Sequence, residues 1–289
     1  MKELTKRIIV AAIGIPFAFL VVYLGGIVFT VVIALISSLA LKEFYDMAEK
    51  KGYPTFKLWG IIIGLIPFVL FILNSIFINL PEDYTPSFLW LIVPILLIPL
   101  IATGTLLLVL FSKRQNAIAS IGAMFTGFLY ISCSFFTLVL LRDVNFFSGN
   151  ENFGLFIVII MFCSIWVCDS AAYFIGRKFG KHKLLERVSP KKSIEGAVAG
   201  FIASVIFFPL ASHFLIPEFN TVYAVILGII VGIFGQIGDL VESKLKREAD
   251  VKDSSDLIPG HGGILDRFDS IIFVSPIVFI FLMIIYFSQ

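Results

Sequence analysis

Long apolar runs separated by short polar breaks make up most of this chain. Nine of these runs approach the length of a membrane-spanning helix, which is roughly 20 residues. The first two are separated only by Gly25 and Gly26, a pair typical of a tight turn. The pattern predicts an all-α polytopic membrane protein with about nine transmembrane helices. Their approximate ranges are 7–24, 26–41, 58–79, 88–111, 117–141, 154–176, 195–216, 221–240 and 270–288.

Two polar loops interrupt the second half of the chain, at residues 177–196 and 239–270. No segment has the pattern of a separate soluble domain. We therefore divide the chain into two parts. Residues 1–150 form an N-terminal transmembrane region of about five spans, and residues 151–289 form a catalytic transmembrane core that carries both loops.

Composition supports the membrane assignment. Hydrophobic residues make up 59% of the 289 residues, charged residues make up 15%, and the mean hydropathy is +1.01. Such a chain is too apolar for an ordinary soluble domain. A β-barrel is excluded because the uncharged runs are much longer than the strands of a membrane barrel.

The positions of lysine and arginine predict the orientation in the membrane. If the N-terminus is cytoplasmic and nine spans are counted, every Lys and Arg except Arg142 falls in a cytoplasmic segment. An error in the number of spans would scramble this asymmetry. We therefore expect a cytoplasmic N-terminus and an outside C-terminus. Both long loops then lie on the cytoplasmic side of the cytoplasmic membrane, where nucleotides are found.

The loop at residues 239–270 begins as a continuation of the eighth run. On such a helix Asp239, Glu242 and Lys246 are three and four residues apart and share a face. Asp239 lies at the membrane boundary, where an acidic residue usually faces a cavity, a cation or a basic partner. The alternative for both acids is a solvated helix end with ordinary charge pairs.

The same loop then becomes rich in glycine. Gly262 and Gly263 follow His261, and glycines allow the backbone to approach a ligand and form an anion-binding nest of amides. Asp266 and Asp269 come next, three residues apart at the start of the last span, where they are expected to share one face. Capping of that helix by the two carboxylates is the alternative.

The carboxylates of this loop suit a hard cation. Oxygen ligands without a supporting Cys or His cluster favour Mg²⁺ over Zn²⁺, and Mg²⁺ combines one or two carboxylates with waters and substrate phosphates. Nearby basic residues and glycine amides are suited to hold those phosphates. The loop therefore predicts phosphoryl or nucleotidyl transfer, which depends mainly on positioning and charge neutralisation. Neither a P-loop motif nor GxGxxG occurs in the chain.

The loop at residues 177–196 adds further candidates. Asp169 lies inside the sixth run, about two helical turns before Arg177, and an Asp embedded in a membrane is a functional candidate. Lys191 and Lys192 stand beside a predicted helix start. Structural hydrogen bonding of Asp169 and simple attraction of the lysines to anionic lipid are the alternatives.

Residues 243–269, SKLKREADVKDSSDLIPGHGGILDRFD, resemble the signature of the phosphatidate cytidylyltransferases, or CDP-diglyceride synthases. The stretches GQIGDLVES, CDSAAYFIGRKFGK and SPKKSIEG are similar to the family's core segments. Ser193 and Ile194 depart from the Thr-Trp expected before Glu-Gly, and the N-terminal half carries no motif. The fitting positions of the signature are Ser243, Leu245, Lys246, Arg247, Lys252, Asp253, Ser255, Ile258, Pro259, His261, Gly262, Gly263, Ile264, Asp266, Arg267, Phe268 and Asp269.

This resemblance implies a reaction in which CTP and phosphatidic acid give CDP-diacylglycerol and pyrophosphate, with Mg²⁺ required. The lipid bilayer is then a further partner, and nucleic acid is not one. A homodimer is one expectation for the assembly. The glycine- and proline-bearing spans indicate close helix contacts without placing an interface.

The resemblance also suggests roles for individual residues. Asp239, Asp266 and Asp269 are expected to hold the metal, with Asp169 beside them and a second cation left open. The backbone of residues 261–263 is expected to cradle the triphosphate. The residues expected to neutralise or contact the substrates are Lys246, Arg247, Lys252, Arg267, Lys191, Lys192 and Ser243.

Two other classes of protein stay open. A CTP-dependent kinase of the polyprenol or dolichol type uses the same nucleotide, as does a synthase acting on ether-linked archaeal lipids. An ion-coupled transporter also places acids in a membrane, but transporters often carry internal repeats and midplane sites. Here no clear repeat is found, and the polar residues cluster at one surface, which argues against transport.

Overall fold

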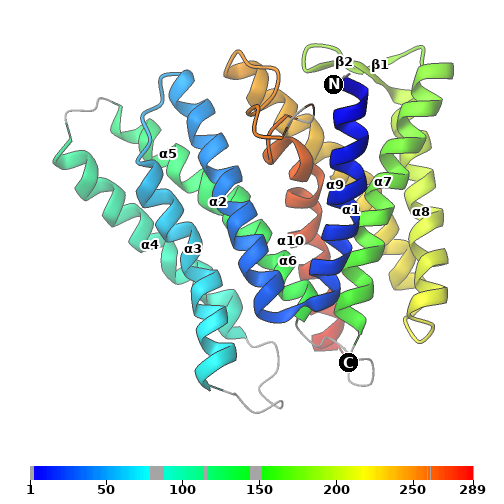
Figure 1. The fold of residues 1–289 in the computed structure, drawn as a ribbon, viewed down its shortest axis with the longest axis horizontal. Helices are drawn as coiled ribbons and strands as arrows, with labels where there is room; N and C mark the ends of the chain where they lie inside the picture. The colour runs from blue at the N-terminus through cyan, green and yellow to red at the C-terminus, as the bar shows by residue number, and fades with distance from the viewer. Residues whose placement is uncertain are drawn as a thin grey trace.

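The computed structural model describes residues 3–78, 88–112, 116–143, 152–258, 260 and 262–288. Most of these residues lie in long helices that form one bundle (Figure 1). The segments labelled η are π-helical turns that continue the preceding α-helix. The elements are α1 (Glu3–Leu24), α2 (Gly26–Lys50), α3 (Lys57–Leu73), η1 (Asn74–Ile78), α4 (Phe88–Leu110), α5 (Ala117–Gly127), η2 (Phe128–Cys133), α6 (Ser134–Asp143), α7 (Phe153–Phe179), β1 (Lys183–Leu185), β2 (Ser189–Ser193), α8 (Ile194–Leu215), α9 (Thr221–Glu248) and α10 (Leu265–Ser288).

Every predicted span falls on one of these helical segments. In the described part of the chain, seven segments are long and apolar enough to cross a membrane. Helices α1 and α4 contribute the shorter apolar stretches Ala12–Leu24 and Ile95–Leu110. The prediction of a helical, polytopic integral membrane protein is therefore confirmed, whereas the number of nine spans stays a prediction.

The outside of the bundle is apolar, as a lipid-facing surface requires. Leu58, Leu110, Phe111, Ile118 and Phe214 are each more than 70% exposed. A soluble monomer rarely displays so many large apolar side chains together. These residues face outwards because each long helix is apolar around most of its circumference, so only one side of it can be buried in the bundle.

The loop between α7 and α8 contains a small β-hairpin that the sequence analysis did not predict. Strands β1 and β2 pair antiparallel, with Lys183 opposite Ser193. The Glu195 carboxylate accepts hydrogen bonds from the backbone N–H of Lys181 (3.1 Å) and His182 (3.2 Å), which ties the start of the hairpin to the start of α8. The Ser193 hydroxyl caps α8 by accepting from the Gly196 N–H.

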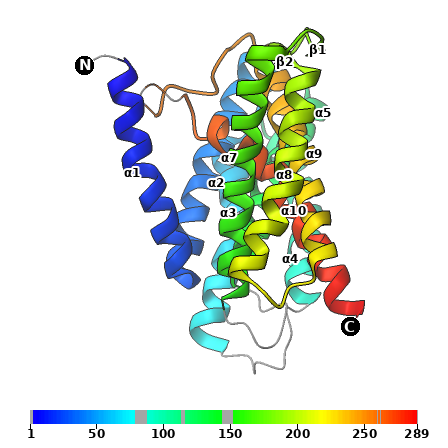
Figure 2. The same ribbon diagram turned by 90° about the vertical axis from the view of Figure 1, so that its right-hand side faces the viewer.

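Both polar loops lie at the same end of the bundle (Figures 1 and 2). The hairpin, the loop that joins α9 to α10 and the start of α1 are at the top, and the end of α10 is at the bottom. This arrangement agrees with the predicted common side for the two loops. Which end faces the cytoplasm stays a prediction.

The C-terminal helices pack in order, α7 on α8, α8 on α9 and α9 on α10, and α10 also contacts α6 and α2. Hydrogen bonds cross between helices where small residues allow close approach. The Ser204 hydroxyl lies 3.0 Å from the Ser164 hydroxyl and donates to the Gly228 carbonyl at 2.8 Å. A side chain at Gly238 would meet the Asp269 carbonyl oxygen at 2.6 Å. Glycine at this position therefore lets α9 approach α10 beside Asp239.

Arg142, the basic residue predicted to lie outside, is used to hold the turn between α1 and α2. Its guanidinium donates to the carbonyl oxygens of Val22 at 2.5 Å and Tyr23 at 3.0 Å. The Asp143 carboxylate accepts from the Gly26 N–H at 2.9 Å. The Arg142 side chain is only 14% exposed. The guanidinium therefore donates to carbonyl groups that have no N–H partner within the last turn of α1.

We predict that Gly25→Ala destabilises the protein by about 1–3 kcal/mol. Gly25 has a φ of +59°, and an added Cβ would overlap the Arg142 guanidinium. Thermal unfolding in detergent measures the change. Gly14→Ala is the matched control, because no atom lies within 4 Å of its added Cβ. Ala at that helical position is expected to raise stability slightly. Equal melting temperatures for the two variants would contradict the role given to Arg142.

Candidate active site

A buried carboxylate from α2 organises the loop before α10. The Glu43 side chain accepts hydrogen bonds from the Ser255 hydroxyl (2.6 Å) and the backbone N–H of Ile264 (2.9 Å) and Leu265 (2.8 Å). The Ser254 hydroxyl also lies 2.8 Å from it. Glu43 is 4% exposed. It therefore acts as a negatively charged cap on α10, supplied from a distant part of the chain.

Asp266 completes this cap from within α10. One carboxylate oxygen accepts from the Gly263 N–H at 2.8 Å and the Ser254 N–H at 2.9 Å, and the other lies 2.5 Å from Lys246 Nζ. The single Ser254 hydroxyl proton can also reach Asp266 at 2.9 Å, so it is shared with Glu43. Neither oxygen of Asp266 is left open in this conformation. Its predicted role as a metal ligand stays a prediction that requires these contacts to be released.

Lys246 joins Asp266 to a second buried acid. Its ammonium lies 2.5 Å from carboxylate oxygens of both Glu242 and Asp266. Glu242 is one helical turn before Lys246 on α9. The prediction that Glu242 and Lys246 share a face of this helix is therefore confirmed. The Glu242 side chain is fully buried, and neither of its oxygens has a hydrogen bond of good geometry. We call Glu43, Glu242, Lys246, Ser254 and Asp266 the loop scaffold.

A second group of acids lies beside the scaffold, and we call it the acidic cluster. Asp169 of α7, Asp239 of α9 and Asp269 of α10 are close enough for their charges to interact, with Lys192 of β2 as the cation among them. Three carboxylates against one ammonium leave a negative charge uncompensated. The structure thus brings together predicted residues that lie up to 100 positions apart in the chain.

The contacts of Asp239 show how the hairpin takes part. One Asp239 oxygen lies 2.5 Å from Lys192 Nζ, and the other accepts from the Ser243 hydroxyl at 3.3 Å. Successive side chains of a strand point to opposite faces. Lys192 therefore reaches inwards while Lys191 is exposed. Of the two lysines predicted to contact substrate phosphates, Lys192 therefore lies in the cluster and Lys191 lies at the surface.

The remaining predicted basic residues are exposed, and we call Arg247, Lys252 and Arg267 the basic rim. Arg247 is near the end of α9, Lys252 is in the loop that follows and Arg267 is in the first turn of α10. The loop between α9 and α10 lies at the same end of the bundle as the hairpin that carries Lys192 (Figure 1). Gly262 has a φ of +79° and its carbonyl accepts from the Ile258 N–H. The Gly263 N–H, predicted to cradle phosphate, donates to Asp266 instead. His261 lies outside the described residues, so its predicted role stays a prediction.

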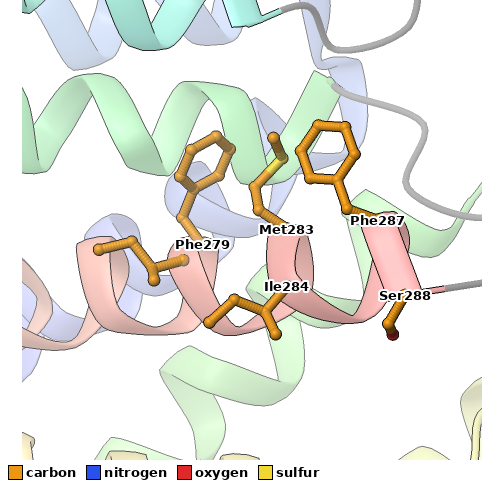
Figure 3. A pocket seen from close by; sticks show the side chains of 6 residues that line it. Phe279, Met283, Ile284, Phe287 and Ser288 are labelled. Carbon is orange, nitrogen blue, oxygen red and sulfur yellow. The ribbon is translucent and has the colours of Figure 1, made fainter.

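Two apolar pockets lie away from the acidic cluster. One is an open surface groove of about 430 Å³ along the C-terminal half of α10, where Phe279, Met283 and Phe287 project from one side of the helix (Figure 3). The other, of about 420 Å³, lies between α2, α5 and α9 and is lined by Met47 and Leu245 among others. Neither is lined by a residue of the acidic cluster. The chemistry-bearing residues are therefore not in the apolar hollows.

The acidic cluster has the donor chemistry that Mg²⁺ requires. In the described residues, no three His, Cys, Asp or Glu side chains are close enough together to hold an ion by themselves. Mg²⁺ does not need such a cage, because it keeps several waters and takes one or two carboxylates with substrate phosphates. Asp239 and Asp269 supply hard oxygens and excess negative charge. These residues therefore fit the predicted cation.

Sequence reasoning missed Glu43, Glu242 as a scaffold residue, and Ser254. The sequence pattern around Glu43 could have indicated that it is buried. Glu43 shares a helical face with the apolar residues Ala40, Phe44 and Met47, all of which are buried, whereas the charged residues at an ordinary helix end face solvent. No signal in the sequence identified the partner loop, because Ser254 is 211 positions away.

The fold and the site together define a class of protein: an integral membrane protein that gathers carboxylates, lysines and a glycine loop at one end of a helical bundle. Comparison with known proteins gives the family. The chain belongs to the cytidylyltransferase family, whose model matches residues 5–285.

Curated relatives named phosphatidate cytidylyltransferase are similar over nearly the whole chain. The protein from Synechocystis sp. is 34% identical, and the alignment covers 97% of each chain. The Bacillus subtilis protein is 33% identical over 98% of each chain. The Staphylococcus aureus protein is 36% identical over 98% of this chain and 99% of its own.

We predict that Glu43→Gln lowers stability by about 2–4 kcal/mol, because a buried charged acceptor is lost and an amide NH₂ then faces the N–H donors of α10. Thermal unfolding in detergent and limited proteolysis of residues 249–264 measure the effect. The matched control is Glu248→Gln, whose half-exposed carboxylate pairs with Lys244. That change is expected to stay within about 0.5 kcal/mol. A Glu43→Gln protein as stable and as protease-resistant as the control would contradict the capping role.

Proposed function

We propose that this protein transfers the cytidylyl group of CTP to phosphatidate, which gives CDP-diacylglycerol and pyrophosphate for phospholipid synthesis. The observation that carries the proposal is the acidic cluster with Lys192, held at the same end of the bundle as the basic rim. Membership of the cytidylyltransferase family supports the nucleotide. The names of the relatives, together with their nearly full-length alignments, support the lipid substrate.

The reaction makes one bond and breaks one. An oxygen of the phosphatidate phosphate attacks the α-phosphorus of CTP, and the bond from that phosphorus to the bridging oxygen of the β-phosphate breaks. Pyrophosphate leaves with the electron pair. A phosphate monoester is already nucleophilic at neutral pH, so the site does not need a strong general base. Positioning and neutralisation of charge are the main requirements.

The residues of the chain supply that neutralisation in two layers. Lys192 lies inside the site and is about one-third exposed, so its ammonium can exchange Asp239 for a phosphate oxygen. Arg247, Lys252 and Arg267 stand at the rim and are suited to hold the outer phosphates. Lys246 is held between Glu242 and Asp266, so we assign it to positioning the loop in this conformation.

The cation we propose is Mg²⁺, held by Asp239 and Asp269 with Asp169 beside them. When bound, it would neutralise the phosphate oxygens around the α-phosphorus and help to orient them. For Asp266, the third predicted ligand, the contacts described above are structural, and a metal role stays a prediction. A second cation also stays a prediction.

The polar end of the bundle is proposed to face the cytoplasm, at the cytoplasmic membrane. CTP is soluble and arrives from that side, whereas phosphatidate presents its headgroup at the membrane surface. The distribution of lysine and arginine supports this orientation. The homodimer expected from the sequence stays a prediction.

We expect purified protein with phosphatidate, Mg²⁺ and CTP labelled in the cytidine to give a labelled lipid and unlabelled pyrophosphate. Thin-layer separation of lipid products and an enzymatic pyrophosphate assay provide the measurement. A CTP-dependent lipid kinase would leave the cytidine label in soluble CDP and release no pyrophosphate. That outcome would exclude the cytidylyl transfer proposed here.

We predict that Asp239→Asn and Asp269→Asn each lower kcat at least about 100-fold while the protein stays folded, since each removes a charged oxygen from the proposed cation site. Asp256→Asn, an exposed position in the same loop, is the matched control and is expected to keep near-normal activity. Turnover across a range of Mg²⁺ concentrations, with melting temperatures for each variant, provides the test. Near-normal turnover in Asp269→Asn would overturn the assignment of the acidic cluster.

A further inference from the structure

A buried phenol from the N-terminal half of the chain lies beside the acidic cluster. Tyr130 is in the middle of η2, the π-helical turn between α5 and α6. Its ring contacts Phe273 of α10 edge-on, with centroids 5.6 Å apart. Phe273 is one helical turn after Asp269 on the same helix. This contact places the Tyr130 side chain next to the part of α10 that carries Asp269.

The hydroxyl of Tyr130 is buried and has no hydrogen-bond partner in the described part of the protein. A buried tyrosine O–H normally finds a partner, because leaving such a group unpaired costs free energy. The phenol oxygen is also close enough to the carboxylates of Asp269 and Glu242 to feel their charge. The carboxylate of Glu242 already pairs with the Lys246 ammonium at 2.5 Å. The unused Tyr130 donor therefore lies near Asp269, whose carboxylate belongs to the acidic cluster.

The π-helical turn gives a reason for this placement. A π-turn inserts an extra residue into an α-helix and redirects the side chains around it, and such turns are frequent at functional sites. The helix from Ala117 to Asp143 contains η2 at the level where it passes α10.

We propose that Tyr130 is a positioning residue for the cytidylyl transfer reaction, whose hydroxyl donates a hydrogen bond to Asp269 when the nucleotide is bound. The proposal rests on the function proposed above, because it acts on a residue of the acidic cluster. It adds a role for the N-terminal half of the chain, which carries no recognisable motif. Tyr130 orients the carboxylate and does not touch the reacting atoms.

Tyr45 provides a matched control for this proposal. Its hydroxyl is also buried and without a hydrogen-bond partner in the described residues. It packs against Gly60 and Gly127 instead. Among the described residues, no carboxylate interacts with it in the way that Asp269 and Glu242 interact with Tyr130. Tyr45→Phe and Tyr130→Phe therefore each remove a buried hydroxyl oxygen that has no hydrogen-bond partner in the described residues. They differ in whether carboxylates lie nearby.

The experiment measures steady-state turnover over a range of Mg²⁺ concentrations, together with the rise in melting temperature that Mg²⁺ and CTP produce without lipid. Tyr130→Phe is expected to lower kcat about tenfold, the size of effect of one lost hydrogen bond to a charged group. It is also expected to raise the Mg²⁺ concentration for half-maximal rate and to reduce the ligand-induced thermal shift. Tyr45→Phe is expected to match the parent protein in all three measurements.

Other outcomes would overturn the proposal. If Tyr130→Phe matches the parent, or if Tyr45→Phe loses as much activity, the hydroxyl has no specific role. Tyr130→Leu, which also removes the ring, separates packing from hydrogen bonding. A loss in the Leu variant alone would assign Tyr130 to packing against Phe273. Failure of the proposed function itself is seen separately, as an absence of labelled lipid with the parent protein.

Discussion

The structure at the polar end depends on one buried carboxylate. Glu43 lies at the N-terminal end of α10, where the backbone N–H groups have no acceptor within the helix. Its carboxylate accepts hydrogen bonds from two of these groups. A carboxylate taken out of water is costly unless hydrogen bonds replace its hydration. Here backbone amides and the hydroxyl of Ser255 provide that replacement, and the positive end of the α10 dipole favours the charge. The same contacts fix the loop against α2, so the N-terminal half of the chain determines where the loop lies.

Once the loop is fixed, the acids of the site take two different roles. Asp266 faces the loop, where Gly263, Ser254 and Lys246 use its oxygens. Asp269, three residues later, faces Asp239 and Asp169 instead. Less than one turn of helix separates an acid whose oxygens hold the loop from an acid that belongs to the acidic cluster. The scaffold binds its charges internally, and the acidic cluster leaves charge uncompensated.

The sequence predicted the features that depend on local pattern. Apolar runs gave the helices, since the requirement to cover a bilayer is visible in any window of about 20 residues. The sequence also predicted that Asp169, Asp239, Asp269 and Lys192 serve one site. It did not separate Asp266 from Asp269, because spacing places both on one face and says nothing about the donors around each. The hairpin was missed because its pairing depends on Glu195 holding residues 181 and 182, a contact that no periodicity reveals.

The uncompensated charge of the acidic cluster explains why the scaffold must be so well satisfied. Three carboxylates beside one lysine repel each other, and this repulsion favours any motion that moves α7, α9 and α10 apart. Gly238 works in the opposite direction, since it lets α9 and α10 approach closely at that level. The Glu43 cap then holds the start of α10 from the other side. The repulsion within the acidic cluster opposes folding. The contacts that offset it lie within a few residues of the cluster, at Gly238 and at Leu265, where they limit the separation of the carboxylates directly.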